Sequence, residues 1–333
     1  MFLVFLVFLV FLAYLAVLGV LGEKAFFVTF LALFARRQEC PAPWDNADLE
    51  AHSDNPTLQI LSADGLELAV WDWPGSGPAI LFAHATGFHG RCWDQIARCF
   101  PGRRRLALDF RGHGRSSKPE LPYPWRAFGR DLVAVAEQLN VRDVIGVGHS
   151  MGGHSMVAAA ALRPGTFSAL LLIDPTIFLA EYYGRALLDV SFVRRRRSNW
   201  NSPEEMFERF RSRPPFDTWQ PATLRDYCEF GLLPSGDGFV LACPPTVEAD
   251  IYTHSTDPDA NLYGEIPNVI QPVVILRGGK LAKLGAFELS ASPTAPDLAS
   301  KFTRGRDVHL KERSHFIPME WPEGVAEEIA RMV

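Results

Sequence analysis

A chain of 333 residues, 48% of them hydrophobic and 21% charged, is long enough to bury one large core with an inserted segment, and its composition is that of a globular protein. Its 33 basic and 38 acidic residues leave a net charge of −5, so no positive excess points to nucleic acid as a partner. The five cysteines are widely spaced and form no CxxC motif, which argues against a zinc site and predicts reduced thiols.

The first 37 residues are the most hydrophobic part of the chain. Met1–Gly22 contains no charged residue, and about 20 such residues cross the hydrocarbon core of a bilayer as a helix. We therefore expect residues 1–37 to be a membrane anchor, with membrane association through residues 1–35. The basic pair that ends this segment favours the cytoplasmic side for the rest of the chain. The alternative is a start codon assigned too far upstream, which would leave a soluble cytoplasmic protein.

A polar stretch follows at residues 38–56, which contains several prolines and asparagines and is interpreted as a linker. After it, Thr57–Ser62 and Leu66–Trp73 are typical of two strands, and the Asp-Gly pair between them predicts an antiparallel hairpin at one edge of a sheet. The apolar runs that come next are typical of strands covered on both faces. These runs are Ala79–His84, Arg105–Phe110, Asp143–Gly148, Ser168–Ile173 and Pro272–Leu276.

Helical patterns separate these apolar runs. They lie at about residues 92–100, 125–140 and 151–163, and a last strand and a closing helix are predicted at 306–312 and Glu323–Met332. Strands that alternate with helices indicate an α/β fold, with a mainly parallel sheet and helices on both faces. Residues 57–175 and 272–333 are assigned to this core.

The alternation stops at residues 176–271, which we name the cap segment. So long an insertion needs structure of its own. It contains helical stretches and a hairpin pattern at Pro234–Leu241. We interpret it as a subdomain that covers the edge of the sheet.

A serine lies where one apolar strand meets a helix, in the sequence Gly148-His149-Ser150-Met151-Gly152. The flanking glycines remove the Cβ atoms that would clash in so tight a turn, and the hydroxyl is therefore raised above the sheet. The N-terminus of the following helix offers unpaired N–H groups to a developing oxyanion. Ser150 is the candidate nucleophile.

A serine hydroxyl needs a base to act as a nucleophile. His315 follows the last predicted strand and precedes the last predicted helix, so it lies on a loop at the sheet edge and is the candidate base. His113 is interpreted as structural. For His89 and His154, a pocket position and a structural role both remain open.

These blocks, taken in order, resemble the α/β-hydrolase superfamily over residues 57–333. Phe82–Phe88 resembles the loop after its third strand, Asp109–Ser116 resembles its fourth-strand block, and Ser150 and His315 match its nucleophile and base. The resemblance implies a mostly parallel eight-stranded sheet with a helical cap insertion.

The same resemblance implies an oxyanion hole formed by the backbone N–H groups of Thr86 and Met151. The chain departs from the family at Ala85, where a second glycine is common.

The acid that completes a catalytic triad is not settled by these matches. The family commonly carries an aspartate after the strand at Pro272–Leu276, where this chain has none. Some members take the acid from the preceding strand, which favours Asp174 as the residue that orients His315 and stabilises its imidazolium. Glu288 and Asp297 are the alternatives.

A substrate pocket is expected beside Ser150. The residues predicted to bind substrate there are His84, Phe88, His89 and His149. Aromatic residues of the cap segment and its border are further candidates, namely Phe178, Tyr182, Tyr183, Phe192 and Trp200.

The predicted activity is that of a serine hydrolase, carboxylesterase-like or lipase-like, which cleaves an ester-like bond of a small or lipidic substrate through an acyl-enzyme. No HExxH, Walker A or Rossmann pattern occurs, so no metal or cofactor is expected. The expected partner is a small-molecule or lipid substrate. Carbon–carbon bond hydrolases, perhydrolases and acyltransferases of the same fold are alternatives, and a non-catalytic binding protein on this scaffold is a further one.

Overall fold

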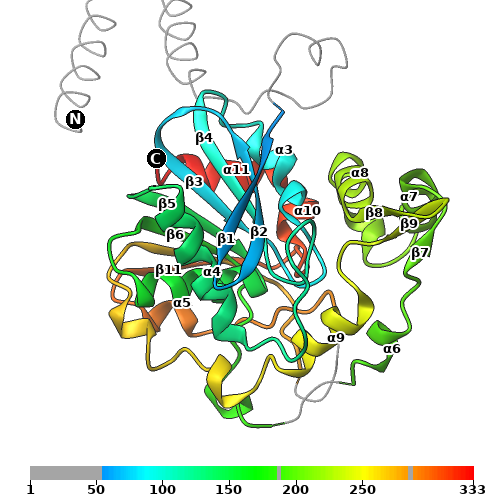
Figure 1. Ribbon diagram of the computed structural model, residues 1–333. Helices are drawn as coiled ribbons and strands as arrows, with labels where there is room; N and C mark the ends of the chain where they lie inside the picture. Colours follow the sequence, from blue (N-terminus) through cyan, green and yellow to red (C-terminus); the bar gives the residue numbers. More distant parts are fainter. Residues whose placement is uncertain (1–54, 186–188, 284–287) are drawn as a thin grey trace, which may run out of the picture. The chain divides into compact units, whose positions relative to one another are not determined.

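The computed structural model describes residues 55–185, 189–283 and 288–333 (Figure 1). The predicted anchor at residues 1–37 and nearly all of the predicted linker lie outside these ranges, so membrane association and the cytoplasmic side stay predictions. Within the described ranges, no helix is both long and apolar enough to cross a membrane.

An eight-stranded sheet forms the centre of the described chain, in the order β1-β2-β4-β3-β5-β6-β10-β11 (Figure 1). The β1–β2 and β2–β4 pairs are antiparallel, and the other neighbours are parallel. The strands are β1 (Thr57–Ala63), β2 (Leu66–Trp73), β3 (Ser76–Ala83), β4 (Arg103–Asp109), β5 (Val144–His149), β6 (Phe167–Ile173), β10 (Val273–Gly278) and β11 (Gly305–Leu310). The predicted α/β fold, its mainly parallel sheet and its antiparallel edge hairpin are confirmed.

The turn of the edge hairpin follows from its two residues. Asp64 and Gly65 have φ values of 50° and 76°, the left-handed conformation of a primed turn. Such a turn matches the twist of the strands that it joins, and it sets Ala63 opposite Leu66.

Helices cover both faces of the sheet, and each face has its own core. On one face, α4 (Trp125–Gln138) and α5 (Met151–Leu162) pack against strand residues such as Leu170. On the other face, α3 (Asp94–Ala97) and α11 (Pro322–Ala330) pack against residues such as Leu171. Consecutive strand residues serve opposite cores because side chains alternate along a strand. The predicted helix at 92–100 is shorter than expected and follows a 3-10 turn at Gly90–Trp93.

The cap segment forms helices and a small sheet of its own between β6 and β10, set beside the main sheet in Figure 1. Its elements are α6 (Ser191–Arg194), β7 (Asn199–Trp200), α7 (Pro203–Phe210), α8 (Pro221–Phe230), β8 (Leu232–Ser235), β9 (Gly238–Leu241) and α9 (Pro245–Thr253). The antiparallel β8–β9 pair confirms the predicted hairpin. Trp219 and Tyr227 of this segment form one hydrophobic cluster with Phe88 and Phe316 of the core, so the cap segment packs on the loops that follow β3 and β11.

Short helices complete the described chain. They are α10 (Ile317–Glu320) and the 3-10 helices Ala180–Tyr182, Phe216–Thr218, Pro258–Ala260, Ile266–Asn268 and Leu298–Lys301. The buried thiols of Cys92, Cys228 and Cys243 are free, as expected for reduced cysteines.

Candidate active site

Ser150 occupies the turn between β5 and α5. Its φ of 56° and ψ of −117° are a conformation that residues with a side chain rarely adopt. Two glycines allow this turn. A Cβ on Gly148 would lie 2.4 Å from the carbonyl oxygen of Gly152, and a Cβ on Gly152 would lie 2.1 Å from that of Ala83. The predicted strand-to-helix corner is therefore present, and it depends on glycine at both positions.

Three side chains from distant parts of the sequence meet at this corner. The Oγ of Ser150 lies 2.9 Å from Nε2 of His315, and Nδ1 of the same ring lies 2.7 Å from Oδ2 of Asp174. Ser150 follows β5, Asp174 follows β6, and His315 lies on the loop between β11 and α10. The other two candidate acids pair elsewhere: Glu288 lies 2.5 Å from Lys280, and Asp297 lies 2.8 Å from Lys301.

The carboxylate of Asp174 is fully buried and has hydrogen-bond donors on both oxygens. Oδ1 accepts the N–H of Gly278 at 2.8 Å, the hydroxyl of Ser292 at 2.6 Å and that of Thr294 at 3.3 Å. Oδ2 faces His315. A buried carboxylate is stable only with such partners, so this network holds Asp174 in place behind the imidazole.

The backbone of Gly278 helps to hold the acid that follows β6. It ends β10, the strand after which the family commonly places its aspartate, and its N–H points to Asp174 instead. A Cβ on Gly278 would lie 3.0 Å from the carbonyl oxygen of Ser314 and 3.4 Å from Oδ2 of Asp174. The closest approach at this position is therefore to the loop that carries His315, whereas the Asp174 carboxylate would be in ordinary contact with a side chain here.

Thr176 is a residue of the site that the sequence interpretation missed. Its Oγ1 lies 3.1 Å from Oγ of Ser150, and its N–H donates to the Ser150 carbonyl at 3.0 Å. The Ser150 hydroxyl has one proton, and if it donates this proton to His315, the Thr176 hydroxyl is the donor to Ser150 Oγ. Its position two residues after Asp174, at the same strand end, was the signal that could have identified it.

The two residues predicted to form an oxyanion hole lie on neighbouring segments. Met151 is the first residue of α5, and Thr86 is in the loop after β3. A Cβ on Gly152 would approach the carbonyl oxygens of Ala83 and His84 to 2.1 and 2.8 Å, so the first turn of α5 packs directly against the start of this loop. Thr86 and Met151 are buried beside the nucleophile corner, and their role as an oxyanion hole stays a prediction.

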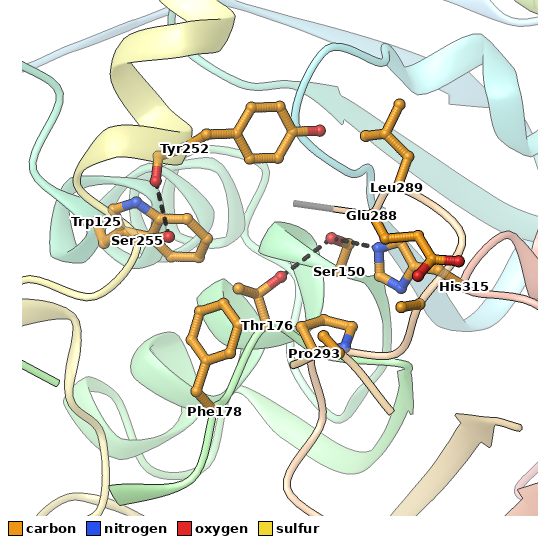
Figure 2. Close-up of a pocket in the computed structure, with 12 residues that line it drawn as sticks. Trp125, Ser150, Thr176, Phe178, Tyr252, Ser255, Glu288, Leu289, Pro293 and His315 are labelled. Atoms are coloured by element: carbon orange, nitrogen blue, oxygen red, sulfur yellow. Dashed lines mark hydrogen bonds between the residues drawn. The ribbon is translucent and has the colours of Figure 1, made fainter. Parts of the chain in front are cut away.

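A pocket opens beside Ser150 and His315, with about 510 Å³ of empty space, part of it open to solvent. Figure 2 shows Trp125, Phe178 and Tyr252 on one side of Ser150, with Glu288 and Leu289 on the other. The larger aromatic and aliphatic residues that line the pocket are Trp125, Phe178, Tyr252, Leu289 and Pro293. Phe178 was among the aromatic candidates from the sequence, whereas Trp125 and Tyr252 were not.

The four residues predicted to bind substrate do not line this pocket. His84 is one of them, and its ring connects two loops at the sheet edge. Nδ1 lies 2.7 Å from the carbonyl oxygen of Ala85, and Nε2 accepts the N–H of Phe110 at 3.0 Å. Burial lowers the pKa of His84 to about 3, so the ring is neutral at pH 7 and holds the loops together.

Phe88 and His89 face the cap segment. Phe88 packs against Trp219 and Tyr227, with ring centroids 5.6 and 5.2 Å apart. His89 stacks on Tyr227, and its Nε2 lies 3.1 Å from that residue's carbonyl oxygen. Burial lowers the pKa of His89 to about 4. Both residues attach the loop after β3 to α8.

His149 supports the backbone of His315. Its Nε2 lies 2.8 Å from the His315 carbonyl oxygen, and the two ring centroids are 4.9 Å apart. Burial, together with the neighbouring His315 ring, lowers the pKa of His149 well below 6.5. The ring is therefore neutral, and its Nε2–H donates to the carbonyl. Although His149 precedes Ser150 in the chain, it does not line the pocket, and it contacts the site through His315.

The remaining histidines of the sequence interpretation bond to backbone. Nε2 of His113 accepts the N–H of Gly87 at 3.0 Å, which agrees with the structural role expected for it. Nε2 of His154 lies 2.8 Å from the carbonyl oxygen of Ala260, and its ring packs on Trp125. The structural alternative therefore describes His154 as well.

The chain resembles known proteins in sequence and in fold. Residues 80–328, more than half of the chain, match the model of the alpha/beta hydrolase family. The chain is 27% identical over 253 residues to 2-(acetamidomethylene)succinate hydrolase of Mesorhizobium japonicum, which covers 74% of this chain and 87% of that protein. It is 35% identical over 125 residues to lipase LipV of Mycobacterium tuberculosis, which covers 37% of this chain and 48% of that protein, about half its length.

A solved structure shares the fold over most of the described chain. The crystal structure of E-2-(acetamidomethylene)succinate hydrolase superposes with a TM-score of 0.68 at 22% sequence identity, and it covers 83% of this chain and 98% of its own.

Proposed function

Because this chain belongs to the alpha/beta hydrolase family, we propose that it is a serine hydrolase that cleaves an ester-like bond of a small or lipidic substrate through an acyl-enzyme. The observation that carries the proposal is the 2.9 Å contact between Ser150 Oγ and His315 Nε2, with Asp174 bonded behind the imidazole. The similarity to LipV, a lipase, is limited to 125 residues, and it supports an ester substrate. A binding protein without catalytic activity would not need Ser150, His315 and Asp174 to be hydrogen-bonded in series.

In the proposed reaction, Ser150 attacks the substrate carbonyl while His315 accepts its proton. Asp174 holds the ring in the correct tautomer and stabilises the imidazolium. The N–H groups of Thr86 and Met151 stabilise the oxyanion that forms. His315 then protonates the leaving alcohol, and a water molecule activated by the same ring releases the acyl group from Ser150.

The test is covalent labelling with a fluorophosphonate probe, which reacts with activated serines. We expect the wild-type protein to be labelled at Ser150, and the Ser150→Ala variant to lose labelling. Ser168→Ala is the matched control, because Ser168 is an exposed serine on β6 and its loss should leave labelling unchanged. A wild-type protein that stays unlabelled, or an alanine variant labelled as fast as wild type, would refute the proposal.

Thr176 allows a second test of the same mechanism. We expect Thr176→Val, which keeps the shape but removes the hydroxyl, to lower kcat/KM for p-nitrophenyl butyrate about tenfold, the cost of roughly one hydrogen bond at the nucleophile. Thr176→Ser restores a hydroxyl and should recover most of the loss. Equal rates for the valine variant and wild type would exclude a role for Thr176 in orienting Ser150.

A further inference from the structure

We infer that the pocket beside Ser150 takes an uncharged, apolar acyl group and rejects acyl groups that carry a carboxylate. This inference rests on the proposed function, and it names the class of substrate. The acyl group is the part of the substrate that is bonded to Ser150 in the acyl-enzyme. Ser150 lines the pocket, so the chemistry of the pocket selects the acyl group.

Two polar groups in the wall of the pocket are bonded within the protein. Nε1 of Trp125 donates to the carbonyl oxygen of Ile251 at 2.8 Å. The hydroxyl of Ser255 donates to the backbone carbonyl oxygen of Tyr252 at 2.8 Å, a bond that Figure 2 shows. The protons of these two groups are therefore already used. An acyl group in contact with Trp125, Phe178 and Leu289 meets apolar ring and methylene surface.

The lining supplies no positive charge to a substrate carboxylate. Among the described residues that line the pocket, none is lysine or arginine. The charged lining residue is Glu288, which is paired with Lys280 at 2.5 Å. The other acid–base pair at the site is already formed, because His315 is held by Asp174. A second carboxylate in the pocket would lose its water without gaining a cation, which is strongly unfavourable.

The experiment compares two esters with the same leaving group and nearly the same length. One is the p-nitrophenyl monoester of glutaric acid, with a free carboxylate, and the other is its methyl ester, in which that charge is removed. We expect kcat/KM for the methyl ester to exceed that for the acid by at least about 100-fold at pH 7, because the pocket cannot replace the hydration of the carboxylate. Fluorophosphonate labelling of Ser150 is measured on the same protein.

A variant tests whether the missing cation is the cause. Leu289→Arg adds a positive charge to the pocket wall. We expect it to lower the ratio of kcat/KM for the methyl ester to kcat/KM for the acid at least tenfold. Ile270→Arg is the matched control, because Ile270 is exposed and lies outside the lining, so the ratio should stay as in wild type. Retained labelling of Ser150 shows that each variant is folded.

The outcomes separate this inference from the proposed function. If Ser150 is labelled and the two esters react at equal rates, or neither reacts, the inference is wrong and the serine hydrolase proposal stands. If Ser150 is not labelled at all, the proposed function itself is wrong. A wild-type preference for the methyl ester that Leu289→Arg reduces and Ile270→Arg leaves unchanged supports the inference.

Discussion

Asp174→Asn is expected to lower kcat about 10⁴-fold while the protein remains folded. The amide keeps the size of the carboxylate, but its NH₂ group facing Nδ1 of His315 favours the wrong tautomer of the ring and cannot stabilise the imidazolium. The hydrogen bonds from Gly278 and Ser292 can still be accepted by the amide oxygen. Steady-state kinetics on p-nitrophenyl butyrate measure the loss, and circular dichroism checks the fold.

The chain offers a matched control for this substitution. Asp297 was one of the acids that the sequence left open, and it is an exposed residue paired with Lys301. Asp297→Asn is therefore expected to keep kcat within about twofold of wild type, as surface substitutions usually do. A near-normal kcat in Asp174→Asn, or a loss of similar size in Asp297→Asn, would assign the acid to another residue.

Gly152→Ala is expected to lower the free energy of unfolding by about 3 kcal/mol or more, although alanine normally stabilises a helix by about 1 kcal/mol relative to glycine. Here the substitution destabilises the protein, because the new Cβ would lie 2.1 Å from the carbonyl oxygen of Ala83 and the backbone of β3 would have to shift. Because that shift moves the loop of Thr86 away from Ser150, the rate of fluorophosphonate labelling should fall as well.

Gly264→Ala is the control for this effect. Gly264 has an ordinary φ, and nothing lies within 4 Å of an added Cβ, so its variant should stay within about 0.5 kcal/mol of wild type. Chemical denaturation followed by fluorescence measures both variants. A Gly152→Ala protein with wild-type stability and labelling would show that the close contact between α5 and β3 is not needed.

Much of the fold was predictable because its signals are local. A strand buried on both faces is an apolar run, as in β5 and β6, and a primed turn needs residues such as Asp64 and Gly65 that tolerate a positive φ. The nucleophile corner is also local, since one serine between two glycines defines it. His315 could be predicted for a related reason, because the order of strands and helices places its loop at the same sheet edge.

Other features depend on which distant segments meet. For the histidines expected in the pocket, position in the sequence did not indicate which side chains line it. His149 precedes the nucleophile in the chain, yet it does not line the pocket, and its ring holds the His315 carbonyl instead. His84 and His89 lie close to Thr86 in the sequence, but both rings contact backbone. Nδ1 of His84 contacts the carbonyl oxygen of Ala85, and Nε2 of His89 contacts the carbonyl oxygen of Tyr227 in the cap segment. Proximity in the chain is a poor guide to pocket position, because the packing of distant segments decides which side chains line the pocket.

By itself, the sequence determined the α/β fold, the serine corner and the histidine, because each is written in a short pattern or in the order of such patterns. Only the tertiary structure decided that Asp174 contacts His315, that Thr176 contacts Ser150, and that an apolar wall with Trp125 and Tyr252 adjoins them. These contacts join strand ends and loops from separate parts of the chain. Their existence depends on packing across the sheet, which no local pattern encodes.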